Sequence, residues 1–298
     1  MSRIVVLGDL NLDILATLPE ELPSEGEVRS PIQAMPGGSA GNFARAAARE
    51  GAEVTFIGCV GNDLVGDLLV RSLQVFGVDT RVKRVGQQSG MILSLVKEDG
   101  KTMICSRGAN DGLDPSWLEE GFFVNVDHLH LSGYGFLSPA QRGATHRAIE
   151  IAHSLDLTIS IDPPPANLIR NFGIPAFLAE ISTADFIFPN LDEGKVLSGK
   201  DDEGSIVDAL AERFPLGALT LGEAGSLAWH GKERNRCVSR SITTIDATGA
   251  GDAFAAGFVI SYLEVHDLAR ANHRGNKAAS QVLKGRGHLA DSPGTPAG

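Results

Sequence analysis

A small-residue loop followed directly by a carboxylate is the part of this sequence best suited to chemistry. Residues 246–257 read DATGAGDAFAAG, so Gly249, Ala250 and Gly251 precede Asp252 at the expected start of a helix. Small residues let backbone N–H groups converge, and a helix N-terminus adds partial positive charge, which suits a phosphate. A carboxylate beside a bound phosphate is electrostatically unfavourable, which suggests a catalytic role. Such a group could take a proton from an attacking hydroxyl during phosphoryl transfer. The alternative is a tight turn with Asp252 as the helix N-cap.

Two further polar clusters suit a ligand that carries hydroxyl groups. Residues 35–42, MPGGSAGN, form a second glycine-rich run before a helix, and the Asn42 carboxamide offers both a donor and an acceptor. The sequence GDLNLD follows the first expected strand, where open α/β sheets bind ligands, and its alternation places Asp9, Asn11 and Asp13 on one side. For each cluster the alternative is a glycine turn or a solvated loop without a ligand.

Short apolar runs alternate with helix-length segments along most of the chain. This pattern predicts an α/β fold in which helices cover both faces of a mostly parallel sheet. Strands are expected at residues 4–8, 54–58, 128–131, 157–162, 185–188 and 216–221. Helices are expected at residues 41–49, 63–76, 139–154, 191–197, 205–213, 252–263 and 267–283.

One region departs from this alternation. Antiparallel strands are expected at residues 28–33, 89–97 and 101–106. Asp99 and Gly100 form the hairpin turn between the last two. We therefore expect a small antiparallel lid, with strands from about 12–35 and 88–107, that projects from the main domain. Extra edge strands of the main sheet are the alternative.

Composition narrows the class of protein and its partners. The 298 residues are 43% hydrophobic and 21% charged, which is typical of a globular protein; we expect one domain at 1–284 and a flexible tail at 285–298. A net charge of −11 favours neither nucleic acid nor an anionic membrane as a partner. The three cysteines are odd in number and dispersed, which indicates a reducing compartment. Without a signal peptide or a membrane-length apolar run, a soluble cytoplasmic protein is expected.

The two glycine runs occur in the order found in a known family. The sequence resembles the ribokinase-like carbohydrate and nucleoside kinases, the PfkB family, over roughly residues 4–284. The resemblance rests on Asp246 to Asp252 and on residues 37–42, GGSAGN, with Gly51, Gly58 and Gly61 downstream. It implies a three-layer α/β sandwich and an ATP-dependent kinase for a small sugar, with a nucleoside or a keto-deoxy sugar acid as alternative acceptors. ATP and Mg²⁺ are the implied cofactors, and similar proteins are often activated by a monovalent cation such as K⁺.

The resemblance also implies roles for single residues. Asp252 matches the catalytic base, and Gly249, Ala250 and Gly251 match the anion hole. The implied substrate-binding positions are Asn11, Asp13, Gly37, Gly38 and Asn42. The implied nucleotide-binding positions are Asn190, Thr220, Gly222, Gly225 and Asn276. Glu193 matches a position near the magnesium, with water between them, and the monovalent cation would lie near Asp246 and Thr248. The lid strands would form the interface of a homodimer.

Three positions bear on the acceptor and on the loop. Ser39 stands where close ribokinase relatives carry Lys, so ribose is less secure as the substrate, and Ala247 stands where the family usually has Thr. Arg107 follows a lid strand and could reach a carboxylate or a phosphate of the substrate; an ordinary surface arginine is the alternative. A free furanose or hexose is the first choice of acceptor, a nucleoside the second and a sugar acid the third.

Two other classes of protein fit the sequence less well. A dinucleotide-dependent dehydrogenase needs its glycines after an early strand, and Asp252 would repel a pyrophosphate at this late loop. A non-catalytic sensor that binds a sugar or a nucleoside would have little reason to keep Asp252. The sequence therefore favours the kinase.

Overall fold

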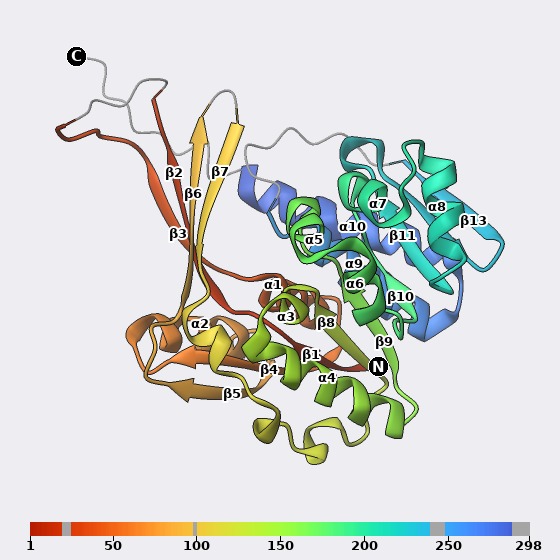
Figure 1. Cartoon of the computed structure of the whole chain (residues 1–298), viewed down its shortest axis with the longest axis horizontal. Coiled ribbons are helices and arrows are strands. Elements are labelled where there is room, and N and C mark those ends of the chain that lie inside the picture. The colour runs from red at the N-terminus through yellow and green to blue at the C-terminus, as the bar shows by residue number, and fades with distance from the viewer. Residues whose placement is uncertain (20–24, 98–99, 239–247, 288–298) are drawn as a thin grey trace.

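The computed structural model describes residues 1–19, 25–97, 100–238 and 248–287 and contains two β-sheets (Figure 1). The larger sheet has the order β13-β12-β11-β10-β9-β8-β1-β4-β5. All its neighbouring strands from β11 to β5 pair in parallel, whereas β12 and β13 pair antiparallel. The strands are β1 (Arg3–Leu7), β4 (Glu53–Gly61), β5 (Asp79–Val85), β8 (His128–Ser132), β9 (Thr158–Asp162), β10 (Phe186–Ile187), β11 (Leu216–Thr220), β12 (Ser226–His230) and β13 (Glu233–Cys237).

Helices cover both faces of this sheet, which confirms the predicted α/β class (Figure 1). Side chains alternate between two apolar cores, as in β1, where Val5 and Leu7 join one core while Ile4 and Val6 join the other. The α-helices are α1 (Ser39–Arg49), α2 (Leu64–Gln74), α3 (Tyr134–Leu137), α4 (Pro139–Ser154), α5 (Ala166–Phe172), α6 (Ile174–Glu180), α7 (Leu191–Ser198), α8 (Glu203–Ala211), α9 (Ala250–Val265) and α10 (Leu268–Gly287). Short 3₁₀ helices lie at η1 (Gly108–Gly112), η2 (Pro115–Trp117), η3 (Glu120–Phe123) and η4 (Gly222–Ala224).

A four-stranded lid projects from this body, with the order β3-β2-β6-β7 (Figure 1). Its strands are β2 (Asn11–Thr17), β3 (Ile32–Gly37), β6 (Gly90–Lys97) and β7 (Gly100–Ser106). The outer pairs are antiparallel, but the central pair β2 and β6 is parallel. The expected all-antiparallel lid is corrected in this respect, because β2 and β6 both leave the main body in the same direction.

Several expected boundaries were wrong. The strand expected at residues 28–33 lies instead at Ile32–Gly37, where it pairs with β2. Ala16 and Ile32 are the outermost pair of this ladder, so residues before Ile32 are not part of the strand. The expected tail at 285–298 begins too early, since α10 continues to Gly287; residues 288–298 lie outside the described part. The strands and α-helices that the pattern missed include β5, β12, β13, α3, α5 and α6. β5 is an edge strand rich in Arg and Lys, and its polar composition hid it.

Among the helices in the described ranges, none is long and apolar enough to cross a lipid bilayer.

Two buried histidines on β8 are held in a hydroxyl network. His128 contacts Thr158 and Ser160 at 2.8 and 2.7 Å, and His130 contacts Ser160 at 2.8 Å while stacking on Phe43. Burial lowers the pKa of His128 to about 3 and that of His130 well below its ordinary value. Both are therefore neutral in the folded protein at neutral pH.

We expect this pair to make the fold acid-sensitive. An unfolded histidine binds a proton below about pH 6.5, so the contribution of each residue to stability is present above that pH and falls by up to about 1.4 kcal/mol per unit below it. Buried carboxyl groups with raised pKa values have the opposite effect, because they stabilise the fold as the pH falls. The test therefore compares the pH dependence of stability in a variant with that in the wild type. His130→Phe should flatten the loss of unfolding free energy between pH 7.5 and 5.5 in urea titrations. Equal pH slopes in both proteins would contradict the expectation.

Candidate active site

Asp252 lies at the third position of α9 and is 8% exposed. It does not cap the helix: the N-cap is Gly249, with φ of 82° and no side-chain cap, so the N-cap alternative for Asp252 is wrong. The Oδ2 atom of Asp252 instead accepts a hydrogen bond of 2.9 Å from Nδ2 of Asn42 on α1. The two glycine-rich runs, 210 positions apart, thus meet at this carboxylate.

A second carboxyl group, which the sequence analysis missed, lies against Asp252. Asp162, the last residue of β9, hydrogen-bonds to the Asp252 side chain, and Oγ of Ser39 lies 3.5 Å from its Oδ2 atom. Burial and the charge of Asp252 raise the pKa of Asp162 well above its ordinary value. Burial also raises the pKa of Asp252, although hydrogen bonds from Asn42, Asp162 and Ser39 oppose this. Both shifts have burial as their largest cause, so the pair holds a proton more readily than two separate, exposed aspartates would.

The lid supplies polar groups above this centre. Asn11 and Asp13 alternate with Leu12 on β2 and so share one face of the lid. Oδ1 of Asn11 accepts a hydrogen bond of 2.8 Å from buried Asn110, whose own Oδ1 accepts from the Leu10 backbone. Within the described residues Nδ2 of Asn11 has no hydrogen-bond partner, which leaves it available as a donor to a ligand.

Glycines keep the floor of this region open. A Cβ atom on Gly37 would meet Oδ2 of Asp13 at 2.0 Å, and one on Gly38 would meet the backbone oxygen of Asp9 at 2.4 Å. Gly38 also has φ of 86°, which side chains rarely tolerate. The glycine run is thus required by the close approach of α1 to the β1–β2 connection.

Arg107 is not an ordinary surface arginine, which corrects the alternative raised for it. Its guanidinium contacts both carboxylate oxygens of Asp9 at 2.8 and 3.3 Å, Asp111 at 2.8 Å and Gln141 at 2.7 Å. Asp9 is only 4% exposed. Asp9 is thus engaged by Arg107 in this structure, and its binding of hydroxyls together with Asn11 and Asp13 stays a prediction.

The predicted nucleotide residues gather around the ends of β10 and β11. Asn190 and Glu193 form a capping box at the start of α7, with bonds of 2.6 to 3.0 Å, and Asn190 bridges to Thr220. Burial raises the pKa of Glu193 to about 8. Gly222 and Gly225 flank the turn after β11 with φ of 58° and 89°.

Asn276 reaches the same turn from α10. Its Nδ2 atom donates to Oγ of Ser226 at 2.6 Å, directly after Gly225. Of the expected monovalent-cation residues, Thr248 is half-buried just before Gly249, and Asp246 lies outside the described residues together with Ala247.

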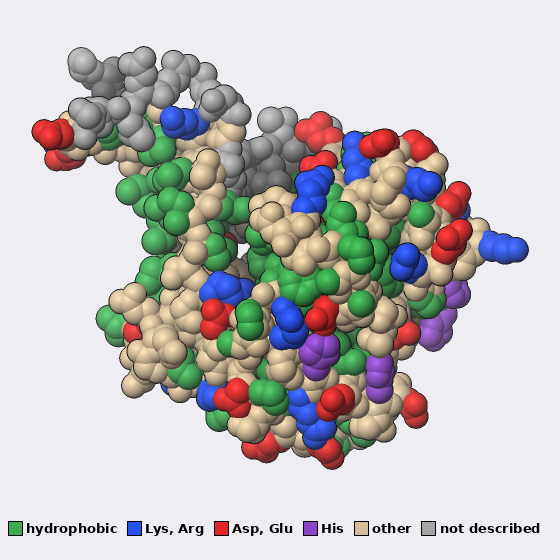
Figure 2. All heavy atoms as spheres, in the orientation of Figure 1, with side chains coloured by type: hydrophobic (Ala, Val, Ile, Leu, Met, Phe, Trp, Pro, Cys, Tyr) green, Lys and Arg blue, Asp and Glu red, His purple; other side chains and the backbone are tan. Residues whose placement is uncertain are grey.

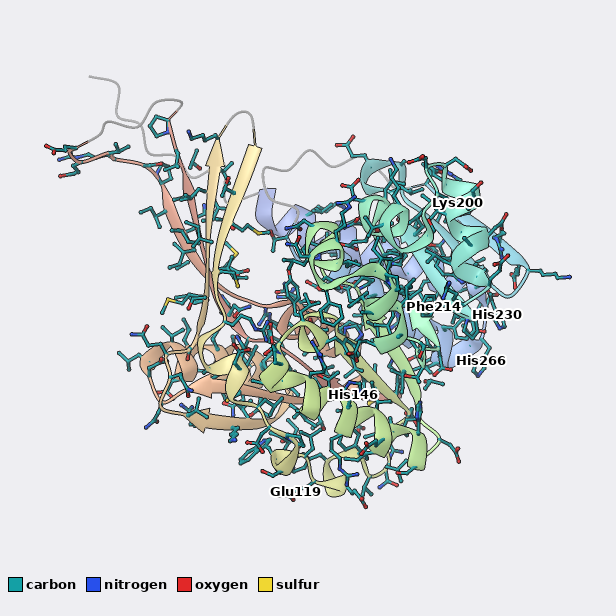
Figure 3. The ribbon with its side chains drawn as sticks, in the orientation of Figure 1. Glu119, His146, Lys200, Phe214, His230 and His266 are labelled. Carbon is teal, nitrogen blue, oxygen red and sulfur yellow. The ribbon has the colours of Figure 1, made fainter. Side chains whose placement is uncertain are left out.

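Exposed histidines lie away from these groups. His230 and His266 both contact the ring of Tyr262, at the end of the molecule remote from the lid (Figure 3). His146 pairs with Glu180 at 2.8 Å on the outer side of α4. None of these three is among the described side-chain partners of Asp252, which are Asn42, Asp162 and Ser39.

Comparison with known proteins agrees with this geometry. The pattern of the pfkB family carbohydrate kinases matches residues 1–294, and the chain belongs to this family. It is accordingly an ATP-dependent phosphotransferase that acts on an alcohol group.

Similar proteins match nearly the whole length of the chain. It is 28% identical to the ribokinase of Bacillus subtilis, covering 94% of this chain and 92% of that one. It is 30% identical to the ATP-dependent ribose-1-phosphate kinase of Halopiger xanaduensis, covering 98% and 95%. The crystal structure of adenosine kinase from Sinorhizobium meliloti matches with a TM-score of 0.86 and 26% identity, covering 95% and 94%.

Proposed function

We propose that this enzyme phosphorylates a hydroxyl group of a small neutral sugar, with Asp252 as the general base. The observation that carries the proposal is the Asp252 carboxylate at the N-terminus of α9, held by Asn42 at 2.9 Å from the other glycine run. A base whose pKa burial raises above that of an ordinary aspartate is better matched to accept a hydroxyl proton near neutral pH.

The N-terminus of α9 is the proposed anion hole. Gly249 leaves this helix without a side-chain cap, so the backbone N–H groups of its first turn can face a ligand. These groups and the helix dipole favour an anion, and they would stabilise charge that develops on a transferred phosphoryl group. Gly249, Ala250 and Gly251 would thus act through their backbone.

Glu193 is the proposed protein group near Mg²⁺. No three His, Cys, Asp or Glu side chains of the described chain gather to hold a metal alone, which fits an ion bound mainly by nucleotide phosphates and water. A divalent ion would stabilise the charged form of Glu193, whose pKa of about 8 marks it as costly to ionise unaided. Mg²⁺ would neutralise phosphate charge. Asn190, Thr220, Gly222, Gly225 and Asn276 would bind the ATP, and a K⁺ ion would lie at Asp246 and Thr248.

The acceptor is proposed to be uncharged. Arg107 is the cation that had suggested a sugar acid, and its bidentate contact with Asp9 and its bond to Asp111 already neutralise it. A sugar acid would have to compete with these carboxylates, which disfavours a keto-deoxy sugar acid. A nucleoside is the second candidate, supported by the likeness to adenosine kinase.

Replacing Asn11 tests the acceptor site. Asn11→Ala should raise KM for the acceptor about tenfold or more while leaving KM for ATP within about twofold, because a donor is lost and Asn110 loses its partner. Thr17→Ala, at the exposed end of the same strand face, is the matched control and should change neither constant. Equal increases in both KM values for Asn11→Ala would place the acceptor elsewhere.

The outer face of the lid is the proposed homodimer interface. Strand pairing places one set of alternating side chains opposite the face of Asn11 and Asp13. This set is mostly apolar, with Thr102 and Ser106 as polar members at the β7 edge; its apolar members include Leu12, Ile14, Ala16, Ile32, Ala34, Leu93, Leu95 and Ile104. Ile32 and Ile104 are 68% and 56% exposed, and apolar side chains gather along the lid in Figure 2. A contiguous apolar sheet face of this kind is typical of a protein–protein contact.

A charge on this face should separate the protomers. Ile104→Asp should yield a monomer at micromolar concentration in sedimentation velocity, because a carboxylate would be desolvated in the interface. Met103→Asp is the control, since Met103 is similarly exposed at 54% but points to the opposite face. A wild-type protein that is monomeric throughout would refute the proposed dimer.

A further inference from the structure

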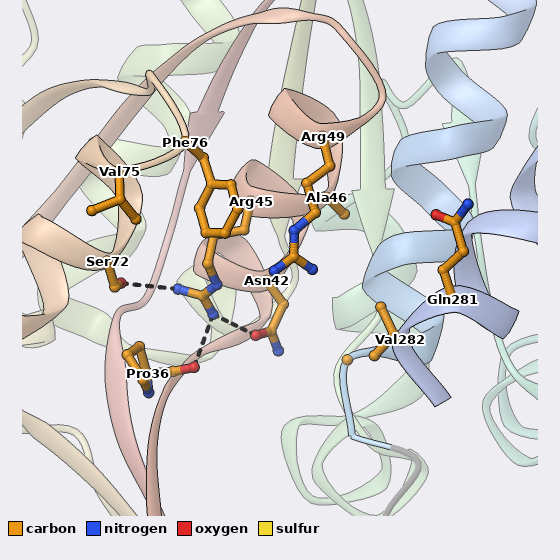
Figure 4. Close-up of a pocket in the computed structure, with 11 residues that line it drawn as sticks. Pro36, Asn42, Arg45, Ala46, Arg49, Ser72, Val75, Phe76, Gln281 and Val282 are labelled. Atoms are coloured by element: carbon orange, nitrogen blue, oxygen red, sulfur yellow. Dashed lines mark hydrogen bonds between the residues drawn. The ribbon is translucent and has the colours of Figure 1, made fainter. Parts of the chain in front are cut away.

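Arg45 lies on α1 three positions after Asn42, and its guanidinium turns back toward that residue (Figure 4). Its Nη2 atom donates to Oδ1 of Asn42 at 2.6 Å and to the backbone oxygen of Pro36 at 3.0 Å. Its Nη1 atom donates to Oγ of Ser72 on α2 at 3.3 Å. Three acceptors from three elements thus fix the guanidinium beside Asn42.

These contacts decide which end of the Asn42 amide faces the base. The arginine side chain carries only hydrogen-bond donors, so the Asn42 amide must turn its oxygen toward Arg45. The amino group of Asn42 must then point the other way, where it donates to Oδ2 of Asp252 at 2.9 Å. With the amide reversed, two oxygens would face each other and the Asp252 carboxylate would lose a donor.

We propose that Arg45 is a positioning residue for the phosphoryl-transfer site: it fixes the Asn42 carboxamide as a donor to Asp252. The inference rests on the proposed role of Asp252 as that base. Arg45 itself does not touch the reacting groups; it acts through Asn42.

The titratable groups around Asp252 other than Arg45 are acidic and supply no positive charge of their own. Within the described ranges, the other titratable and polar groups that interact with it are Asp162 from β9, Ser39 and Asn42 from α1, and the more distant Glu193 from α7 and Tyr134 from α3. The titratable members of this set carry negative charge when ionised. The charge of Arg45 lowers the pKa of Asp252 against the effect of burial.

Arg49 provides a matched comparison. It follows Arg45 by one helical turn, lines the same cavity of about 410 Å³ and lies over the ring of Phe76, with its guanidinium carbon 4.5 Å from the ring centre (Figure 4). No hydrogen bond joins it to Asn42 within the described structure. The cavity also lets a shorter or uncharged side chain replace either arginine without overpacking.

Kinetics of three variants test the proposal. Arg45→Met should lower kcat about tenfold and move the acid limb of the kcat/KM pH profile about 0.5 to 1 unit higher, since both the amide orientation and the charge are lost. Arg45→Lys keeps the charge but not the planar fork, so kcat should fall with the acid limb near its wild-type position. Arg49→Met should resemble wild type in both. If Arg45→Met matches Arg49→Met, or if Arg45→Lys keeps full kcat, the proposal is overturned.

A titration independent of turnover separates this inference from the proposed function. In ¹³C NMR the carboxyl signal of Asp252, identified by its absence in Asp252→Asn, should titrate about 0.5 to 1 pH unit higher in Arg45→Met than in Arg49→Met. Equal midpoints would overturn the role of Arg45 even in an active enzyme. A wild-type protein without acceptor-dependent ADP release would refute the kinase proposal, while the NMR midpoints would still decide whether Arg45 acts on Asp252. If Arg45→Met does not fold, kcat of Arg45→Lys tests the proposal instead: a decrease supports the role of Arg45, and a wild-type value overturns it.

Discussion

Asp252→Asn should lower kcat by about 10² to 10⁴, the usual worth of a general base, while the Kd for ATP stays within about twofold. Asparagine has nearly the same shape and can still accept the bond from Asn42, so the loss isolates the proton acceptor. Steady-state kinetics and calorimetric ATP titration measure the two quantities. Turnover near the wild-type value would remove Asp252 from the role of base.

The same substitution should not weaken the fold. At neutral pH the raised pKa values of Asp162 and Asp252 mean that holding both carboxyl groups together costs stability, and asparagine relieves this cost. The melting temperature should therefore equal or exceed that of the wild type. Asp67→Asn is the matched control: Asp67 also lies in the first turn of a helix but is exposed and paired with Arg84, so kcat should be unchanged.

Gly38→Ala should cost about 2 to 6 kcal/mol of unfolding free energy, the sum of a strained positive φ and an overpacked contact. The added Cβ would meet the backbone oxygen of Asp9 at 2.4 Å, and neither backbone can move without displacing α1 or β2. Because α1 carries Ser39 and Asn42, any folded variant should also lose most of its activity. Urea unfolding at neutral pH measures the stability.

Gly51→Ala is the control for the Gly38 substitution. Gly51 follows the other end of α1 with φ of 93°, but nothing lies within 4 Å of its added Cβ, so only the backbone strain of about 1 to 3 kcal/mol applies. Kinetic constants of this variant should be those of the wild type. Equal stability losses for the two variants would show that contact between the added Cβ and the Asp9 backbone costs nothing beyond the backbone strain.

The sequence predicted the parts of the fold that depend on apolar periodicity. Strands β1, β8, β9 and β11 and helices α1, α4 and α7 were found because buried strands are continuous apolar runs and the helices have clear ends, such as Gly51 after α1. The pattern could not find β5, β12 and β13, since these strands at or near the sheet edges carry charged or polar residues. Nor could it show the parallel β2–β6 pair, which joins segments about 80 residues apart in sequence.

The candidate site was predictable where short motifs carry it. The glycine runs and the Asn190 and Glu193 pair were located by local sequence, and the structure brings Asn42 to Asp252. Asp162 was missed although it ends an expected strand, where the rule applied to residues 8–13 would have found it. Arg45 and Asn110 carried no local signal, because their roles come from contacts across the fold.

The pairing of Arg107 with Asp9 was equally hidden from the sequence. Their residues lie 98 positions apart, and only the packing of the β1–β2 connection against η1 brings them together. This ion pair changes the choice among acceptors more than any motif does, since it occupies the one cation that had suggested a sugar acid.

A coupled ADP-release assay with Mg-ATP and a panel of acceptors tests the central claim most directly. We expect that neutral pentoses or hexoses raise ADP release well above the rate with ATP alone, that sugar acids do not, and that Asp252→Asn abolishes the increase. Release stimulated only by sugar acids, or by no acceptor on a panel that includes nucleosides, would contradict it.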